Sequence, residues 1–211
     1  MSRYAPLVIF CYRRKIDGLI NSLLKNQEAK DTELFIFSDG FKTKADKKDV
    51  VNLRRNLKKI RGFKSLHIIE SDKNKGLANS IIEGTTKVIN KFDKIIVLED
   101  DLIVSSHFLD FMNKSLSLYQ NKTDIWSVSG YSPAIPQLID YKKEVYLTLR
   151  SSSWGWATWA DRWKKVDWSI SDFKVLKKNK EKIMSFEQGG NDLFKMLELQ
   201  YLGKIDSWAV R

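Results

Sequence analysis

The sequence predicts an α/β fold with a mostly parallel sheet, and two features support that prediction. Across the first two thirds of the chain, short apolar runs alternate with longer segments of helical periodicity. Parallel strands need a crossover connection, usually a helix, and this alternation provides one after each strand. The chain has 211 residues, of which 43% are hydrophobic, enough to pack helices against both faces of a sheet. We therefore expect one domain over residues 1–211, with a Rossmann-like sheet flanked by helices.

The expected strands are continuous apolar runs, which are typical of strands buried on both faces. They cover residues 7–12, 34–37, 66–69, 94–98 and 125–128. The expected helices carry apolar residues at spacings of three and four, the pattern of an amphipathic helix. They cover residues 16–24, 46–60, 77–89 and 106–119. The order of these elements is that of consecutive βα units.

The pattern changes after Gly130. The second part is expected to contain an edge strand at 145–149, a tryptophan-rich run at 154–159, and helices at 172–184 and 191–201. No linker rich in Gly, Ser or Pro separates this part from the first, so we read residues 1–130 and 131–211 as two halves of one domain. The sequence ends directly after an apolar patch, and we expect the domain to be truncated there.

The charge balance favours an anionic partner. Lys and Arg number 37 against 26 Asp and Glu, a net charge of +11, which suits nucleic acid, acidic lipid or a phosphate-bearing small molecule. The basic segment 42–64 is read as a solvated helix face. The single cysteine, Cys11, excludes an internal disulfide. No apolar stretch approaches the roughly 18 residues that span a bilayer, so we expect a cytoplasmic protein without a transmembrane segment, with a peripheral position at the inner membrane face left open.

Three consecutive acids, Glu99, Asp100 and Asp101, follow the expected strand 94–98. Adjacent carboxylates repel one another, and the carboxyl end of a parallel strand borders the usual ligand crevice of an α/β sheet. Oxygen ligands of this kind suit Mg²⁺ or Mn²⁺. The alternative is that the acids cap the next helix near its positive end. One acid would suffice for a cap, so we favour a metal site.

Other polar residues follow the remaining parallel strands. Tyr12 and Arg13 end the first strand, and Asp39 follows the second, where it either shapes a turn or serves a ligand. The loop 72–78 after the third strand contains Lys75 and opens a helix, so it either holds a phosphate or is an ordinary helix start. Because these strand ends share one edge of the sheet, the set fits a nucleotide diphosphate bound with a divalent cation.

These motifs together carry a resemblance to a known family. Residues 6–13, 37–39, 74–78 and 97–102 look like the nucleotide-sugar-binding half of a GT-A-fold glycosyltransferase. The acid triplet, followed shortly by His107 and Phe108, is similar to the N-acetylglucosaminyltransferase I group and its bacterial family 2-like relatives. The tryptophan-rich run and the Asp206-Ser-Trp208 ending resemble the acceptor half of that group.

The resemblance implies roles for the residues around the nucleotide. Asp101 would be the direct ligand of Mn²⁺ or Mg²⁺, and Glu99 and Asp100 would lie near the ribose and donor sugar. Asp39 would accept a hydrogen bond from uracil. Tyr12 and Arg13 would line the nucleotide pocket.

The resemblance also implies roles on the acceptor side. Members of the group invert the anomeric centre with a carboxylate as general base, and Asp206 matches that position best, with Asp192 as second choice. Asp206 can otherwise be read as a turn acid. Trp154 and Trp156 are candidates for stacking on a sugar, with burial in the core as the alternative.

These observations favour an inverting, metal-dependent glycosyltransferase that uses a nucleotide sugar, expected to be UDP-linked, and a saccharide acceptor in bacterial surface-polysaccharide assembly. A nucleotidyltransferase is the second reading, but residues 6–15 contain no glycine for its usual phosphate loop. A nucleic-acid-binding protein would explain the positive charge, but the sequence has no recognisable DNA or RNA module. The acid triplet would also repel phosphate, so we expect no nucleic-acid partner.

Overall fold

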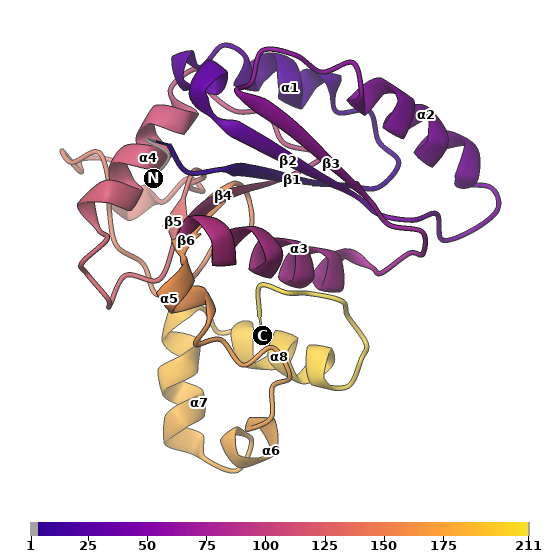
Figure 1. Ribbon diagram of the computed structural model, residues 1–211. Coiled ribbons are helices and arrows are strands. Elements are labelled where there is room, and N and C mark those ends of the chain that lie inside the picture. The colour runs from indigo at the N-terminus through magenta and orange to yellow at the C-terminus, as the bar shows by residue number, and fades with distance from the viewer. Residues whose placement is uncertain (1–3, 211) are drawn as a thin grey trace.

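The computed structural model describes residues 4–210 and has a six-stranded sheet at its centre (Figure 1). The strand order is β3-β2-β1-β4-β6-β5. The strands are β1 Leu7–Cys11, β2 Glu33–Ser38, β3 Ser65–Glu70, β4 Lys94–Glu99, β5 Val128–Ser129 and β6 Trp156–Trp159. Strands β1 to β4 run parallel, whereas β6 runs antiparallel to both β4 and β5. The expected α/β class with a mostly parallel sheet is confirmed.

Helices cover both faces of this sheet (Figure 1). One face carries α1 Asp17–Leu23, α2 Lys47–Leu57 and α4 Phe108–Leu118, and the other carries α3 Leu77–Phe92. β1 is buried along its whole length because its side chains alternate between two cores. Leu7 and Ile9 belong to the core with α1 and α4, and Val8 and Phe10 belong to the core with α3. Burial on both faces is why this strand is apolar without alternation.

The helices of the second half extend beyond α3 in Figure 1. They are α5 Ala160–Trp163, α6 Phe173–Leu176, α7 Lys180–Phe186 and α8 Leu193–Tyr201. Short 3-10 helices cover Gln27–Asp31, Pro136–Leu138 and Glu187–Gly189. Ile170, Phe173 and Leu197 form a small separate core among these helices. Within residues 4–210 the structure has no helix that is long and apolar enough to cross a membrane.

Two sequence expectations about the second half are wrong. Residues 145–149 form no strand, and the side chains of Leu147 and Leu149 are largely exposed. The strand that extends the sheet past β4 is β6, which lies inside the tryptophan-rich run. The single helix expected over 172–184 is two helices, because the side chain of Asn179 accepts a hydrogen bond from the Lys182 amide and so begins α7 afresh.

Candidate functional site

The acid triplet lies at the carboxyl end of β4 and divides between two directions. The Glu99 carboxylate faces the α3 side, where the nearby Trp208 side chain partly offsets the rise of its pKa. The Asp100 and Asp101 carboxylates face the end of β1. The Tyr12 amide donates to Asp100 Oδ2 at 3.1 Å, and Arg14 Nη1 lies 2.8 Å from Asp101 Oδ2. Asp100 and Asp101 are therefore the two acids of the triplet whose carboxylates lie beside the residues that follow β1.

The charges in the triplet are only partly compensated. Burial, together with the nearby charges of Asp101 and Asp100, raises the pKa of Glu99 to about 7. Burial is also the main cause that raises the pKa of Asp100. Both shifts mean that the site disfavours its own negative charge. A bound cation would stabilise the charged carboxylates, which agrees with the metal site expected from the sequence.

The donor set fits a hard divalent cation. In the part of the chain that the structure describes, no three His, Cys, Asp or Glu side chains are grouped so as to hold a metal ion. Mg²⁺ is commonly held by one or two carboxylates, with substrate phosphates and waters completing its ligands. The Asp100 and Asp101 pair therefore fits a metal that binds together with a diphosphate.

We expect Glu99 to make the stability of the metal-free protein depend on pH. Between its ordinary value of 4.5 and its folded pKa of about 7, the folded state binds more protons, so the free energy of unfolding falls as pH rises. Glu99→Gln removes this titration. Urea unfolding is measured in EDTA between pH 4 and pH 8. Over this range the free energy of unfolding of the wild type should fall by on the order of 2–3 kcal/mol more than that of Glu99→Gln. The exposed Glu181→Gln is the matched control. Parallel pH profiles for wild type and Glu99→Gln would contradict the shift.

Asp39 holds the loop that follows β3. Its buried carboxylate accepts hydrogen bonds from the amides of Gly40 at 2.8 Å, Lys75 at 2.9 Å and Gly76 at 3.1 Å. The ammonium group of Lys75 pairs with Glu83 on α3. The amides of Lys75 and Gly76 are therefore already bound, so they are not free to hold a phosphate in this conformation. The proposed contact between Asp39 and uracil stays a prediction.

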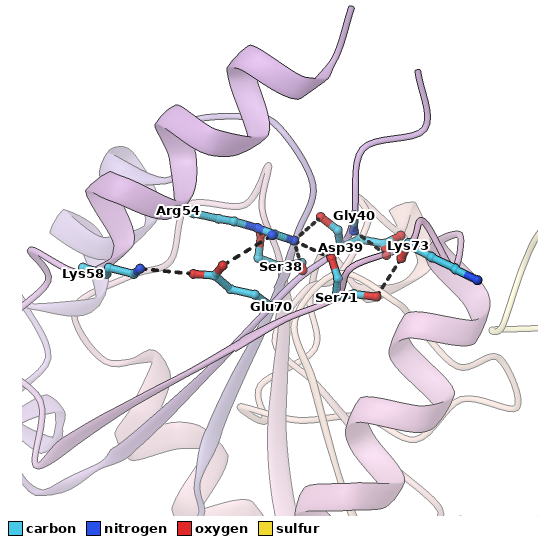
Figure 2. Close-up of polar contacts among 8 residues, drawn as sticks. All are labelled: Ser38, Asp39, Gly40, Arg54, Lys58, Glu70, Ser71 and Lys73. Atoms are coloured by element: carbon cyan, nitrogen blue, oxygen red, sulfur yellow. Dashed lines mark hydrogen bonds and ion pairs between the residues drawn. The ribbon is translucent and has the colours of Figure 1, made fainter. Parts of the chain in front are cut away.

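Arg54 on α2 was missed by the sequence reading of segment 42–64 as a solvated face. Figure 2 shows its guanidinium reaching across the carboxyl ends of β2 and β3. Nη2 donates to the carbonyl oxygens of Ser38 at 3.1 Å, Asp39 at 3.1 Å and Ser71 at 2.7 Å. A signal was present in the sequence, because Arg54 falls on the buried face of α2 together with its apolar residues. Those residues are Val50, Leu53 and Leu57.

We expect Arg54→Ala to destabilise the fold. Three carbonyl groups at the strand ends would lose a charged donor; the Ser71 amide would still donate to the Ser38 oxygen, and each buried group left unsatisfied typically costs roughly 1–3 kcal/mol. Urea denaturation should show a loss of at least about 2 kcal/mol. The control is Arg55→Ala, since the exposed Arg55 side chain bonds only weakly, at 3.4 Å, to Asn52 of the same helix. Equal midpoints for the two variants would show that the guanidinium contacts are not stabilising.

Tyr12 and Arg13 are tied to Asp46, a second residue that the sequence reading missed. The Tyr12 hydroxyl donates to Asp46 Oδ2 at 2.9 Å, and the Arg13 guanidinium forms an ion pair with the same carboxylate. Hydrogen bonds from Thr43 and Tyr12 lower the pKa of Asp46 to about 2. The Tyr12 and Arg13 side chains thus lie at the end of β1 as expected, but in this structure their polar groups bind protein.

Asp206 lies at the same edge of the sheet as the acid triplet. The amide of Ala78, in the first turn of α3, donates to Asp206 Oδ2 at 3.3 Å. A Cβ at Gly76 would lie 2.9 Å from the same oxygen, so the absence of a side chain there lets the carboxylate approach. Two residues later, Trp208 contacts Glu99. The structure therefore brings Asp206 to the start of α3, near the end of β4.

Asp192 has a different environment. Arg150 Nη1 and Nη2 donate to its two carboxylate oxygens at 2.6 Å and 2.8 Å. This pair lowers the pKa of Asp192 to about 2. A carboxylate stabilised in this way is a weak proton acceptor, which counts against Asp192 as a general base.

The two candidate sugar-stacking tryptophans differ in exposure. Trp156 is 3% exposed, and its ring centroid lies 5.5 Å from that of Trp163 and 4.6 Å from that of Trp208. Because β6 places it in the core against other aromatic rings, the prediction of sugar stacking is wrong for Trp156. Trp154 is 54% exposed, with the Tyr131 ring 4.5 Å away, and its role stays a prediction.

Comparisons with known proteins give weak likenesses only. No family model matches the chain, and no curated protein matches its sequence. The solved mannosyltransferase PcManGT from Pyrobaculum calidifontis, in complex with GDP-Man and Mn²⁺, is 11% identical with a TM-score of 0.49. The alignment covers 75% of this chain and 46% of that one.

A second similar structure is glucosyl-3-phosphoglycerate synthase from Mycobacterium tuberculosis, in complex with Mg²⁺ and UDP. It is 12% identical with a TM-score of 0.41, over 74% of this chain and 57% of that one. The chain thus spans about half the length of the two glycosyltransferases. At these identities and TM-scores, a functional assignment has to rest on the site itself.

Proposed function

We propose that this chain is a metal-dependent glycosyltransferase of the GT-A fold, which moves a sugar from a UDP-sugar to a saccharide acceptor with inversion. The observation that carries the proposal is the pair Asp100 and Asp101 beside Arg14 at the carboxyl edge of a parallel sheet. Ligands of open α/β sheets bind at this edge. The site combines acids that need a cation with an arginine suited to a phosphate.

The donor is held by the ends of β1, β2 and β4. Asp101, with Asp100 beside it, would hold Mn²⁺ or Mg²⁺, which when bound supplies positive charge to stabilise the departing diphosphate. Tyr12 and Arg13 would line the nucleotide pocket. Asp39, whose carboxylate binds the amides of Lys75 and Gly76, would also accept a hydrogen bond from the uracil base. Glu99 and Asp100 would lie near the ribose and donor sugar.

Asp206 would act as the general base. A base must lie within hydrogen-bond reach of the acceptor hydroxyl, on the side of the donor sugar opposite the diphosphate, if the reaction inverts. The contact of Asp206 with the start of α3 holds its carboxylate at the edge of the sheet that carries the acids. The exposed ring of Trp154 is proposed to stack on a saccharide. By the resemblance to bacterial family 2-like enzymes, the proposal extends to bacterial surface-polysaccharide assembly.

Ligand-dependent thermal stability tests this function. UDP with Mn²⁺ should raise the melting temperature, since a ligand at about a hundred times its dissociation constant adds roughly 2.7 kcal/mol of stability. CDP with Mn²⁺ should raise it less, because cytosine presents an acceptor where uracil presents an N–H. UDP in EDTA and single-stranded DNA serve as comparisons. Stabilisation by DNA, with none by UDP and Mn²⁺, would favour a nucleic-acid-binding protein and overturn the proposal.

A further inference from the structure

Arg14 is the cation that lies beside the acidic pair Asp100 and Asp101. Its Nη1 lies 2.8 Å from Asp101 Oδ2 and 3.8 Å from Asp100 Oδ1. The other oxygen of Asp100, Oδ2, is bound to the Tyr12 amide. The guanidinium therefore lies beside one oxygen of each carboxylate, Asp101 Oδ2 and Asp100 Oδ1.

The two adjacent arginines, Arg13 and Arg14, pair with different acids. Arg13 is bound to Asp46, which is itself fixed by Tyr12. The Arg14 side chain is 63% exposed, and among residues 4–210 its ion pairs are with Asp100 and Asp101. An exposed ion pair is weak, so a divalent cation can replace a single guanidinium charge at these oxygens.

We propose that Arg14 is a built-in counter-cation, which holds Asp100 and Asp101 together until a metal ion displaces it and which then binds the diphosphate that arrives with the metal. The inference rests on the proposed function and adds to it a role for Arg14 in the binding of both the metal and the diphosphate. A guanidinium presents several donors in a fork that matches phosphate oxygens. Once released, Arg14 remains close to the metal and can pair with a diphosphate bound to it.

The proposal requires opposite effects on two ligands. Before the nucleotide binds, Arg14 competes with the metal, so its removal should tighten binding of Mn²⁺ alone. Once the nucleotide is present, Arg14 contributes a contact, so its removal should weaken binding of UDP at saturating Mn²⁺. A residue with a purely structural role would weaken both.

The experiment measures Mn²⁺ alone and UDP separately in four proteins: wild type, Arg14→Gln, Arg14→Lys and Arg55→Gln. Free Mn²⁺ is followed by electron paramagnetic resonance, and UDP binding at saturating Mn²⁺ is followed by calorimetry. Arg14→Gln should bind Mn²⁺ alone about three to ten times more tightly. The metal would no longer have to break the ion pair of Arg14 with the acids, and the positive guanidinium would no longer repel it. The same variant should bind UDP at least about ten times more weakly, since a charged hydrogen bond to phosphate is lost. Arg14→Lys should stay close to wild type for Mn²⁺.

Thermal melting gives an independent measurement. In EDTA, Arg14→Gln should melt at a lower temperature than wild type because Asp100 and Asp101 lose their counter-charge. Addition of Mn²⁺ should narrow or reverse that difference in melting temperature. The control Arg55→Gln removes an equal charge from the outer face of α2, and its melting temperature should match that of the wild type with and without Mn²⁺.

The possible failures are distinguishable. Equal or weaker Mn²⁺ binding in Arg14→Gln, with binding in wild type and Arg55→Gln intact, overturns the role of Arg14 and leaves the proposed function standing. Tighter Mn²⁺ binding with unchanged UDP affinity overturns the second half of the role, the contact with the diphosphate. Absence of Mn²⁺ binding in all four proteins, with and without UDP, overturns the metal site and this proposal with it.

Discussion

Replacing Asp101 by Asn is expected to abolish Mn²⁺-dependent binding of UDP while the fold is kept. The Asp101 side chain is 56% exposed and its ion pair is with Arg14, so the core does not depend on it. The neutral amide keeps the shape but removes the charge that would hold the cation. Loss of even an indirect metal contact commonly costs 10–100-fold in affinity, so a direct ligand should cost at least about a hundredfold.

Calorimetric titration of UDP with and without Mn²⁺ measures this effect. Asp110→Asn is the matched control, because Asp110 carries the same charge on α4 and pairs with Lys114 of that helix. The melting temperature of the metal-free proteins shows whether both variants fold. Full Mn²⁺-dependent affinity in Asp101→Asn would mean that the acid triplet caps the segment before α4 and holds no metal.

The parallel part of the sheet could be predicted from sequence because each of its strands has a recognisable local sequence pattern. β1, β2 and β4 are runs of apolar residues between polar loops, and each is followed by an amphipathic helix. The antiparallel part of the sheet could not be predicted from sequence, since strand formation there depends on pairing with a strand that is distant in the sequence. Residues 145–149 have the more regular alternation, yet the Trp156–Trp159 segment is the one that pairs with β4. Burial against Trp163 and Trp208 decides this, and such contacts are not visible in a local pattern.

The position of the candidate site could be predicted, but the hydrogen bonds within it could not. The acids follow β4 and Asp39 follows β2, and parallel topology alone brings these strand ends to one edge. Whether Asp39 faces a ligand or binds the amides of Lys75 and Gly76 depends on the loop conformation. Arg54 was missed because an arginine in a basic segment is usually solvated, and its burial depends on the carbonyl groups of two strands that it meets only after folding.

Asp206→Asn is expected to reduce sugar transfer by about 10² to 10⁴ while UDP and Mn²⁺ binding stay within about threefold of wild type, since a positioned proton acceptor is usually worth that much. The variant is informative because the Asn amide oxygen can still accept the hydrogen bond from the Ala78 amide. The anchoring of the segment to α3 is thereby preserved while its basicity is removed. Transfer is measured in single turnovers with the UDP-sugar that stabilises the protein most.

Two further substitutions separate the chemical role of Asp206 from a structural one. Asp206→Ala removes both the base and the acceptor for Ala78, so it should lose the same activity and also unfold at lower urea. Asp172→Asn removes an equal charge at an exposed position before α6 and should leave transfer unchanged. If Asp206→Asn transfers sugar at the wild-type rate, the residue only anchors the segment to α3. If Asp192→Asn alone causes the loss, the base lies at the start of α8, and the Arg150 pair would have to open before that carboxylate accepts a proton.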